Sequence, residues 1–196
     1  MSSGFFIHDK VDSILPNDLE DKKILDVGFG YGYNGFNIRM KKRGKPKSLI
    51  GIDLFKPYCD RMRKLRIYDY VINDDIMNQD ISYLLEKINI TICTDVLEHQ
   101  EREKALELLD KLISITDELL IISTPLNFIV TKEVDGNKKN EHLCKIGVDD
   151  FKVRGFKVEI LPLIHGSSKE RLLYRLYCKI RGKPIRDSII AVKDMK

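Results

Sequence analysis

Residues 24–32 read Ile-Leu-Asp-Val-Gly-Phe-Gly-Tyr-Gly, a short apolar run that ends in a carboxylate and is followed by three glycines at alternate positions. A helical pattern comes next, so the stretch predicts a buried parallel strand that turns sharply into a helix. α/β sheets bind ligands at this edge, where glycine lets a ligand lie against the main chain. The N–H groups and the dipole at the start of the helix point at the same place. A nucleotide-like ligand is the first expectation.

Two details of the turn narrow the choice of nucleotide. A dinucleotide fingerprint requires Gly-x-Gly-x-x-Gly, but Tyr33 holds the third glycine position and the glycine comes one place early, at Gly32. No Gly-Lys-Ser/Thr follows, which excludes a P-loop. Asp26 at the end of the strand would oppose a pyrophosphate and attract an ammonium group. A ligand with an amino-acid end and a nucleoside end fits better.

The sequence resembles the class I S-adenosylmethionine-dependent methyltransferases, whose first motif is acidic-x-Gly-x-Gly-x-Gly. Asp26, Gly28, Gly30 and Gly32 match that motif, and the resemblance covers about Lys22 to Val192. It implies S-adenosylmethionine as cofactor, with Asp26 turned toward the methionine ammonium directly or through water. The three glycines would make room for the ligand.

A second carboxylate, Asp53, ends the next apolar run a little over 20 residues after the glycines. A carboxylate there can accept two hydrogen bonds from a ribose diol, and Leu54 beside it is included in the expected cofactor site. The alternative is a helix N-cap or a loop aspartate. We favour the ribose role because Asp53 is paired with the glycine turn.

Asp75 and Ile76 follow the third predicted strand. In the resembled family an acidic residue here accepts from the adenine amino group, and the next apolar side chain flanks the ring. Because Asp74 is adjacent, the two aspartates could equally be a cap and a solvated neighbour.

The fourth apolar strand runs into Asp95-Val-Leu-Glu-His99, a sequence common in the same family. Asp95 would lie near the methionine end or the methyl acceptor. His142, late in a polar segment, and His99 are the candidate general bases, although a solvent-facing His142 and a structural His99 remain alternatives. His8 and His165 read as surface or packing residues. Asp95, Glu98, His99 and His142 also resemble a metal-dependent branch of the family, but we expect no metal requirement.

Apolar and helical patterns alternate along the chain. Strands are expected at residues 23–27, 48–53, 71–73, 90–95, 118–123, 156–163 and 188–192, and helices at 5–15, 32–42, 57–70, 101–115, 148–153 and 168–180. This order predicts an α/β fold with a doubly wound, right-handed parallel sheet. The resemblance adds an antiparallel last strand, which gives a mostly parallel seven-stranded sheet in a three-layer sandwich.

The length of 196 residues suits one methyltransferase-like domain over 1–196. Residues 1–20 are expected to form a lid or an edge helix, and residues 124–147 a long loop that selects the substrate. Because 43% of the residues are hydrophobic and 33% charged, the composition is that of a soluble globular protein. The four cysteines form no Cys-x-x-Cys pair, and no leader or membrane span is visible, so a cytoplasmic location is expected and a membrane partner is not.

The acceptor is expected to be a small molecule. Nucleic acid is a possible partner through three basic clusters, although a solvated helix face is the commoner explanation. The clusters are Lys41–Lys47, Arg61–Arg66 and the Arg171, Arg175, Lys179 stripe opposite Leu172, Leu176 and Ile180. The net charge of +4 permits an anionic partner without implying one. The alternatives are an RNA or metal-assisted O-methyltransferase, a non-catalytic cofactor-binding module, and a nicotinamide oxidoreductase, which Asp26 and the shifted glycine disfavour.

Overall fold

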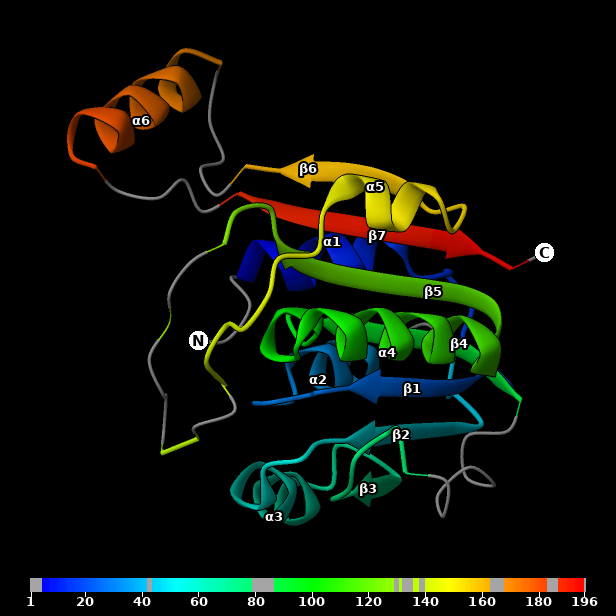
Figure 1. Cartoon of the computed structure of the whole chain (residues 1–196). Helices are drawn as coiled ribbons and strands as arrows, with labels where there is room; N and C mark the ends of the chain where they lie inside the picture. The colour runs from blue at the N-terminus through cyan, green and yellow to red at the C-terminus, as the bar shows by residue number, and fades with distance from the viewer. Residues whose placement is uncertain are drawn as a thin grey trace.

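The computed structural model describes residues 5–41, 44–78, 87–128, 131, 136–137, 140–162, 168–182 and 187–195. Within them, seven strands form one sheet in the order β3-β2-β1-β4-β5-β7-β6 (Figure 1). The strands are β1 (Lys23–Val27), β2 (Ser48–Ile52), β3 (Tyr70–Ile72), β4 (Ile88–Thr94), β5 (Thr116–Pro125), β6 (Lys157–Leu161) and β7 (Ser188–Asp194). The helices are α1 (Phe5–Ile14), α2 (Tyr33–Met40), α3 (Lys56–Leu65), the 3-10 turn η2 (Leu97–His99), α4 (Arg102–Ile115), α5 (Val148–Lys152) and α6 (Ser168–Ile180).

The direction of the strands follows the expected pattern. β1 pairs in parallel with both β2 and β4, β2 pairs in parallel with β3, and β4 pairs in parallel with β5. β7 is antiparallel to both of its neighbours, β5 and β6. The mostly parallel seven-stranded sheet with an antiparallel last strand is therefore confirmed. The order reverses between β1 and β4, which is the switch point where such sheets bind ligands.

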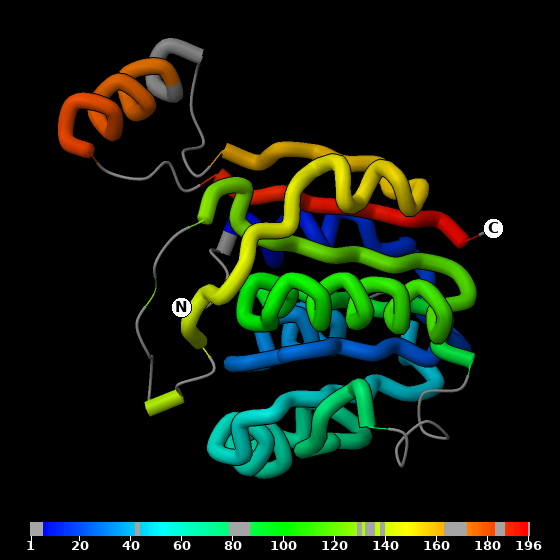
Figure 2. Tube along the Cα trace, in the orientation of Figure 1, coloured from blue at the N-terminus to red at the C-terminus, as the bar shows by residue number. Residues whose placement is uncertain are grey.

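Helices cover both faces of the sheet, so the fold has three layers (Figures 1 and 2). Alternate residues of each strand point to opposite faces. On one face, Leu25 and Val27 of β1 belong to a core that includes the buried residues of α4 and α5. On the other, Ile24 belongs to a core built with α1, α2 and α3. The sequence of α4 places Ala105, Leu109 and other apolar residues on one broad face, and Ala105 and Leu109 are fully buried there.

Some local expectations are wrong. The sequence of α2 offers Phe36, Ile38 and Met40 for packing, but Phe36 and Met40 are 49% and 66% exposed and only Ile38 is buried. Residues two apart share a face on a strand but not on a helix, which explains the error. The helix expected at 57–70 ends at Leu65, because Arg66 adopts a left-handed conformation with φ of 54°.

α6 has the expected bounds, but its apolar side is not buried. Leu172, Leu176 and Ile180 are exposed, whereas Cys178 on another side of the helix is only 2% exposed. The helix stands apart from the sheet near the end of β6 (Figures 1 and 2). The sequence pattern identified the apolar stripe correctly but not the direction in which it faces. In the part of the chain that the structure describes, no helix is long and apolar enough to cross a membrane.

Candidate functional site

The turn after β1 needs its glycines. Gly28, Gly30 and Gly32 have φ values of 64°, 52° and 75°, in the left-handed region. A Cβ atom built on Gly28 would lie 2.3 Å from Cγ2 of Val96, and one on Gly32 would lie 2.4 Å from Sδ of Met62. Side chains at these two positions would therefore clash as well as strain the backbone. The turn leads directly into α2, and one N-terminal N–H of that helix, from Gly35, is bonded to the carboxylate of Asp26.

A cavity of about 560 Å³ lies at the carboxyl ends of the central strands, within the size range of small-molecule sites. Most of the residues singled out in the sequence line it: Gly28, Gly30, Asp53, Leu54, Asp75, Ile76, Asp95 and His99. Asp26, Gly32 and His142 are not among the lining residues. The carboxyl ends of β1, β2, β3 and β4 thus bring four separate sequence motifs to one place.

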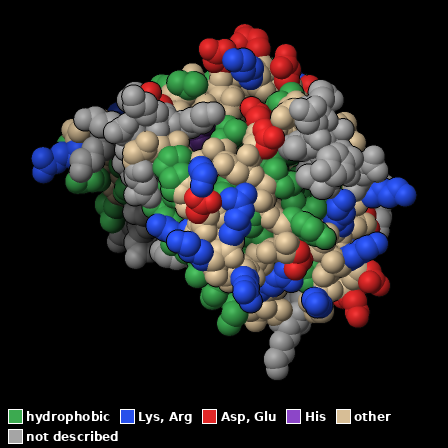
Figure 3. Space-filling view, turned by 90° about the horizontal axis from the view of Figure 1, so that it is seen from below, with side chains coloured by type: hydrophobic (Ala, Val, Ile, Leu, Met, Phe, Trp, Pro, Cys, Tyr) green, Lys and Arg blue, Asp and Glu red, His purple; other side chains and the backbone are tan. Residues whose placement is uncertain are grey.

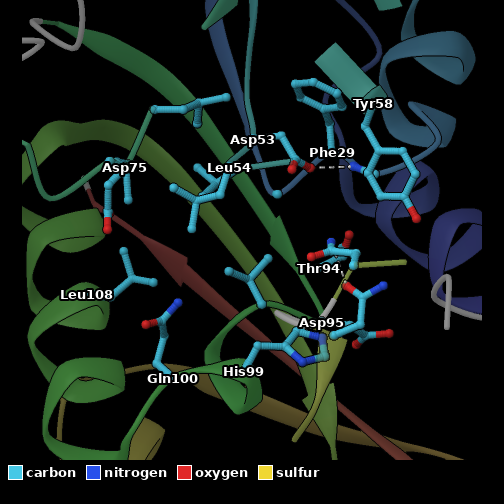
Figure 4. A pocket seen from close by; sticks show the side chains of 18 of the residues that line it. Phe29, Asp53, Leu54, Tyr58, Asp75, Thr94, Asp95, His99, Gln100 and Leu108 are labelled. Carbon is cyan, nitrogen blue, oxygen red and sulfur yellow. Dashed lines mark hydrogen bonds between the residues drawn. The ribbon is translucent and has the colours of Figure 1, made fainter. Parts of the chain in front are cut away.

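Asp53 follows β2 and is held by the glycine turn itself. Its Oδ2 accepts a hydrogen bond from the N–H of Gly30 at 3.0 Å (Figure 4). Its Oδ1 accepts one from the N–H of Phe55 at 2.8 Å. Burial raises the pKa of the Asp53 carboxyl, while the hydrogen bonds from Phe55 and Gly30 lower it. Each carboxylate oxygen has a second lone pair, so the group can still accept from a ligand's hydroxyls.

The wall beyond Asp53 combines one carboxylate with apolar side chains. Oδ1 of Asp75 accepts from the N–H of Met77 at 2.9 Å, which fixes the loop after β3. Ile76 is 6% exposed, and Leu54 and Leu108 also line the cavity. Figure 4 shows Leu54, Asp75 and Leu108 on one side of the cavity, away from Asp95 and His99. A flat apolar ring with one polar edge would suit this wall.

Asp26 does not reach the cavity. Its side chain is fully buried on the α2 and α3 face of the sheet, where Tyr68 Oη donates to Oδ2 at 2.7 Å and Asn34 Nδ2 donates to Oδ1 at 3.3 Å. Burial raises the pKa of Asp26 to about 6. Of the two contacts expected for Asp26, the buried position disfavours the direct one, because strand alternation points this side chain behind the turn, and contact through water stays a prediction. Gly32 is likewise covered by Met62 rather than open to a ligand.

At the other end of the cavity, β4 leads into a constrained turn. Asp95 has a φ of 53°, and its Oδ1 accepts a hydrogen bond from Oγ of Ser123 at 2.8 Å. Thr94, Asp95 and His99 lie together in Figure 4. This end holds the histidine and the carboxylate expected near the methionine or the acceptor.

Three possible metal ligands meet beside this end. One ligand atom from each of Glu98, His99 and His142 lies within 4.8 Å of the others, and the rings of His99 and His142 are 5.0 Å apart. Leu143 and Cys144 donate their N–H groups to the carbonyl oxygen of Glu98 at 2.7 and 3.2 Å. These bonds hold the end of the long loop against η2 and bring His142 to the cluster. Asp95, the fourth candidate, is not part of this group.

The chemistry of the cluster fits a divalent cation. Oγ1 of Thr124 donates to Oε2 of Glu98 at 3.2 Å, but Oε1 is buried with no hydrogen-bond partner among the described residues. Burial, and then the charge of Asp95, raise the pKa of Glu98 well above its usual value. Nδ1 of His99 lies 3.1 Å from the carbonyl oxygen of Glu141, which can only accept, so Nδ1 carries the proton and Nε2 the lone pair. Burial lowers the pKa of His99 and keeps it neutral, as a metal ligand or a base requires.

Comparisons with known proteins agree on the fold. No protein-family model matches the chain, and no curated protein matches it in sequence. Among solved structures, the chain is similar to a SAM-dependent methyltransferase from Archaeoglobus fulgidus, with 17% identity, a TM-score of 0.59 and coverage of 98% of this chain and 95% of the other. It is also similar to the magnesium protoporphyrin IX methyltransferase ChlM from Synechocystis PCC 6803 with bound SAH, with 18% identity, a TM-score of 0.58 and coverage of 96% and 82%. A third is the small RNA methyltransferase HEN1, with 16% identity, a TM-score of 0.61 and coverage of 96% of this chain and 25% of HEN1.

The chain has the class I methyltransferase fold. The strand order, the antiparallel β7 and the cavity at the switch point all belong to it.

The class I methyltransferase fold brings His8 into the site, which the sequence did not indicate. His8 lines the cavity from α1, is 7% exposed, and has its Nδ1 2.7 Å from Oδ1 of Asn34. Its Nε2 is buried and has no hydrogen-bond partner among the described residues. The surface alternative for His8 is therefore wrong, and the packing alternative agrees with its burial, although the residue also lines the cavity. Helix α1 packs on one face of the sheet and also forms a wall of the cavity, because Ile7 and Val11 belong to the core beside His8.

The long loop contributes to the cavity as expected, within the residues that the structure describes. Asn137 and Asn140 line it, and Oγ1 of Thr131 accepts from the N–H of His142 at 3.0 Å. The other residues of the expected substrate loop at 129–130, 132–135 and 138–139 lie outside the described residues, as does His165.

The basic clusters do not form one surface around the cavity. Lys45 and Lys47 precede β2, so they lie at the edge of the sheet opposite the cavity, and Lys42 and Arg43 lie outside the described residues. Arg61 is near the site, with its guanidinium 5.4 Å from the ring centre of Tyr31. On the face seen in Figure 3, Lys and Arg side chains are scattered among acidic and apolar ones.

Proposed function

We propose that this protein is an S-adenosylmethionine-dependent methyltransferase. The observation that supports it best is the cavity where the glycine turn, Asp53 and Asp75 converge. Asp53 would accept from the ribose hydroxyls, because its oxygens are oriented by two backbone donors and retain free lone pairs. Asp75 would accept from the adenine amino group, and Leu54 and Ile76 would flank the ring.

When bound, S-adenosylmethionine supplies an activated methyl group on a sulfonium. The protein's part is then to hold the acceptor in line with the methyl carbon and to exclude water. His99 faces the cavity as a neutral imidazole with an available Nε2, so it can take a proton from an acceptor hydroxyl. His142 would assist from the loop, 5.0 Å from His99 between ring centres.

A small-molecule acceptor remains the first choice. The volume of about 560 Å³ has to hold the cofactor and the reacting end of the acceptor, and Asn137, Asn140 and His99 offer neutral polar groups there. A nucleic-acid substrate would favour a continuous basic surface around the opening. The arrangement of the basic clusters offers little support for one.

Isothermal titration of the purified chain with S-adenosylhomocysteine, S-adenosylmethionine and NAD tests the proposal. We expect one molecule of either adenosyl ligand per chain and no binding of NAD. NAD binding without adenosyl-ligand binding would support an oxidoreductase. Binding of the adenosyl ligands without transfer to any acceptor would support a non-catalytic module of the same fold.

A second candidate function is metal-assisted O-methylation, and the Glu98, His99 and His142 cluster favours it. The unpaired Oε1 of Glu98 and the lone pair on Nε2 of His99 suit a divalent cation, which would orient acceptor hydroxyls beside the methyl group. The expectation of no metal requirement stays a prediction, and this geometry argues against it. One of the similar solved structures is an RNA methyltransferase, so a terminal RNA ribose is an acceptor to test.

Titration with Co²⁺, followed by its visible absorbance, tests the cation site without an activity assay. We expect one equivalent to bind and the bands to be lost in Glu98→Gln and His142→Ala. Glu141→Gln is the matched control, because Glu141 is adjacent to His142 and its side chain is exposed. Absence of binding, or equal binding by all variants, would remove the metal-assisted candidate.

A further inference from the structure

Helix α6 presents a stripe of large apolar side chains to the outside. Their exposed fractions are 67% for Leu172, 56% for Leu173, 50% for Leu176, 47% for Tyr177 and 73% for Ile180. At 3.6 residues per turn these positions fall on one side of the helix. We refer to them as the α6 stripe.

The helix is attached to the rest of the protein by its other side. Cys178 is 2% exposed, and Arg175 forms an ion pair with the buried carboxylate of Asp187 at 3.0 Å. Positions 175 and 178 lie opposite the centre of the α6 stripe on a helical wheel. The stripe therefore lies on the side of α6 that is away from these contacts. Figures 1 and 2 show that the helix itself stands apart from the sheet. Contiguous exposed apolar surface of this kind marks an interaction site.

The sequence around the stripe is strongly basic. Residues 168–187 contain seven lysines and arginines and two acidic residues, and the ion pair of Arg175 with Asp187 takes up one of each. A second copy docked through the same helix would bring two such segments together, and their like charges would repel. RNA could pair with the basic side chains but would leave the apolar stripe in water. An anionic lipid surface satisfies both features, since acyl chains bury apolar side chains and headgroups attract Lys and Arg.

We propose that the α6 stripe docks the protein onto an anionic membrane surface. The helix lies in the interface and does not span it, because its 13 residues are about 20 Å long, against a hydrocarbon core of about 30 Å. The expectation of no membrane partner rested on the absence of a spanning segment, which this mode of binding does not need. Docking would hold α6, and the strand ends beside it, at the lipid surface.

Co-sedimentation with lipid vesicles tests the proposal on the full chain. We expect binding to vesicles of phosphatidylcholine with phosphatidylglycerol, and weak binding to phosphatidylcholine alone. Leu176→Asp with Ile180→Asp should weaken binding at least about tenfold, because two apolar contacts are lost. Val153→Asp is the matched control, since Val153 is 78% exposed at the end of α5 and should leave binding unchanged.

Three results would overturn the proposal. The first is absence of binding to the anionic vesicles, or an unchanged affinity in the double variant. The second is light scattering that shows a dimer of the wild-type chain which the double variant loses, because the stripe would then be an interface between copies. The third is binding of a short RNA that the double variant loses while vesicle binding is unaffected. Thermal unfolding of each variant tests whether the fold is retained. Lys179→Glu, which keeps the α6 stripe intact, should lower binding to the anionic vesicles.

Discussion

Replacing Asp53 by alanine tests the ribose contact proposed for this residue. The carboxylate lines the cavity and is held by the N–H groups of Gly30 at 3.0 Å and Phe55 at 2.8 Å. A hydrogen bond from a hydroxyl to a charged group contributes about 1.5–3 kcal/mol. Since about 1.4 kcal/mol is a tenfold change, we expect Asp53→Ala to lower the affinity for S-adenosylhomocysteine by roughly 10- to 100-fold.

The same change removes the acceptor of two backbone donors, so affinity and stability must be measured separately. Titration calorimetry gives the affinity and thermal unfolding gives the stability. Asp53→Asn keeps one oxygen and should restore part of the stability but not the full affinity. Asp117→Ala, which removes an exposed carboxylate from β5, is the control and should change neither. An Asp53→Ala protein that is folded and binds as tightly as the wild type would refute the ribose role.

Three further predictions concern the polar groups around the cavity. If a cation binds at Glu98, its uptake should release a proton, because the pKa of Glu98 is raised well above its usual value. Calorimetry in buffers that differ in ionisation enthalpy detects this proton release. A binding enthalpy that does not depend on the buffer would contradict the prediction. His8→Asn keeps a donor for Asn34 but lacks Nε2, which we expect to accept a hydrogen bond from the ammonium group of the ligand. The variant should therefore bind S-adenosylhomocysteine about tenfold more weakly and 5′-methylthioadenosine, which has no ammonium group, with unchanged affinity. Equal weakening of both ligands would show that the role of His8 is purely structural. The pKa of Asp26 rises from 3.8 to about 6 on folding, so the folded state binds this proton more tightly and the free energy of unfolding should fall by up to roughly 3 kcal/mol as the pH rises through this interval. In Asp26→Asn that part of the pH dependence, measured by denaturant unfolding, should be absent, and an unchanged slope would place the titration elsewhere.

Much of the fold could be predicted because its signals are local. The apolar runs at 23–27 and 48–53 and the glycines between them define a strand, a tight turn and a second strand, whatever the rest of the chain does. The antiparallel direction of β7 has no such local signal and came from the resemblance to a family. The outward face of α6 also could not be predicted, because an amphipathic pattern gives the stripe but not the surface that covers it.

The position of a site residue could be predicted where the residue directly follows a strand. It was harder to predict where tertiary packing determines the direction of the side chain. Asp53 and Asp75 line the cavity because both follow parallel strands that end at the same edge. The burial of Asp26 could not be predicted, since the alternation of β1 turns its side chain toward Tyr68. His8 was missed because only the packing of α1 beside α2 brings it to Asn34, 26 residues away in sequence.

A crystal structure of the chain with S-adenosylhomocysteine would test the central proposal most directly. The proposal predicts ribose hydroxyls within hydrogen-bond distance of the Asp53 carboxylate, the adenine ring flanked by Leu54 and Ile76, and its amino group at Asp75. Ligand density elsewhere on the protein, or a ligand in this cavity with its ribose away from Asp53, would contradict it.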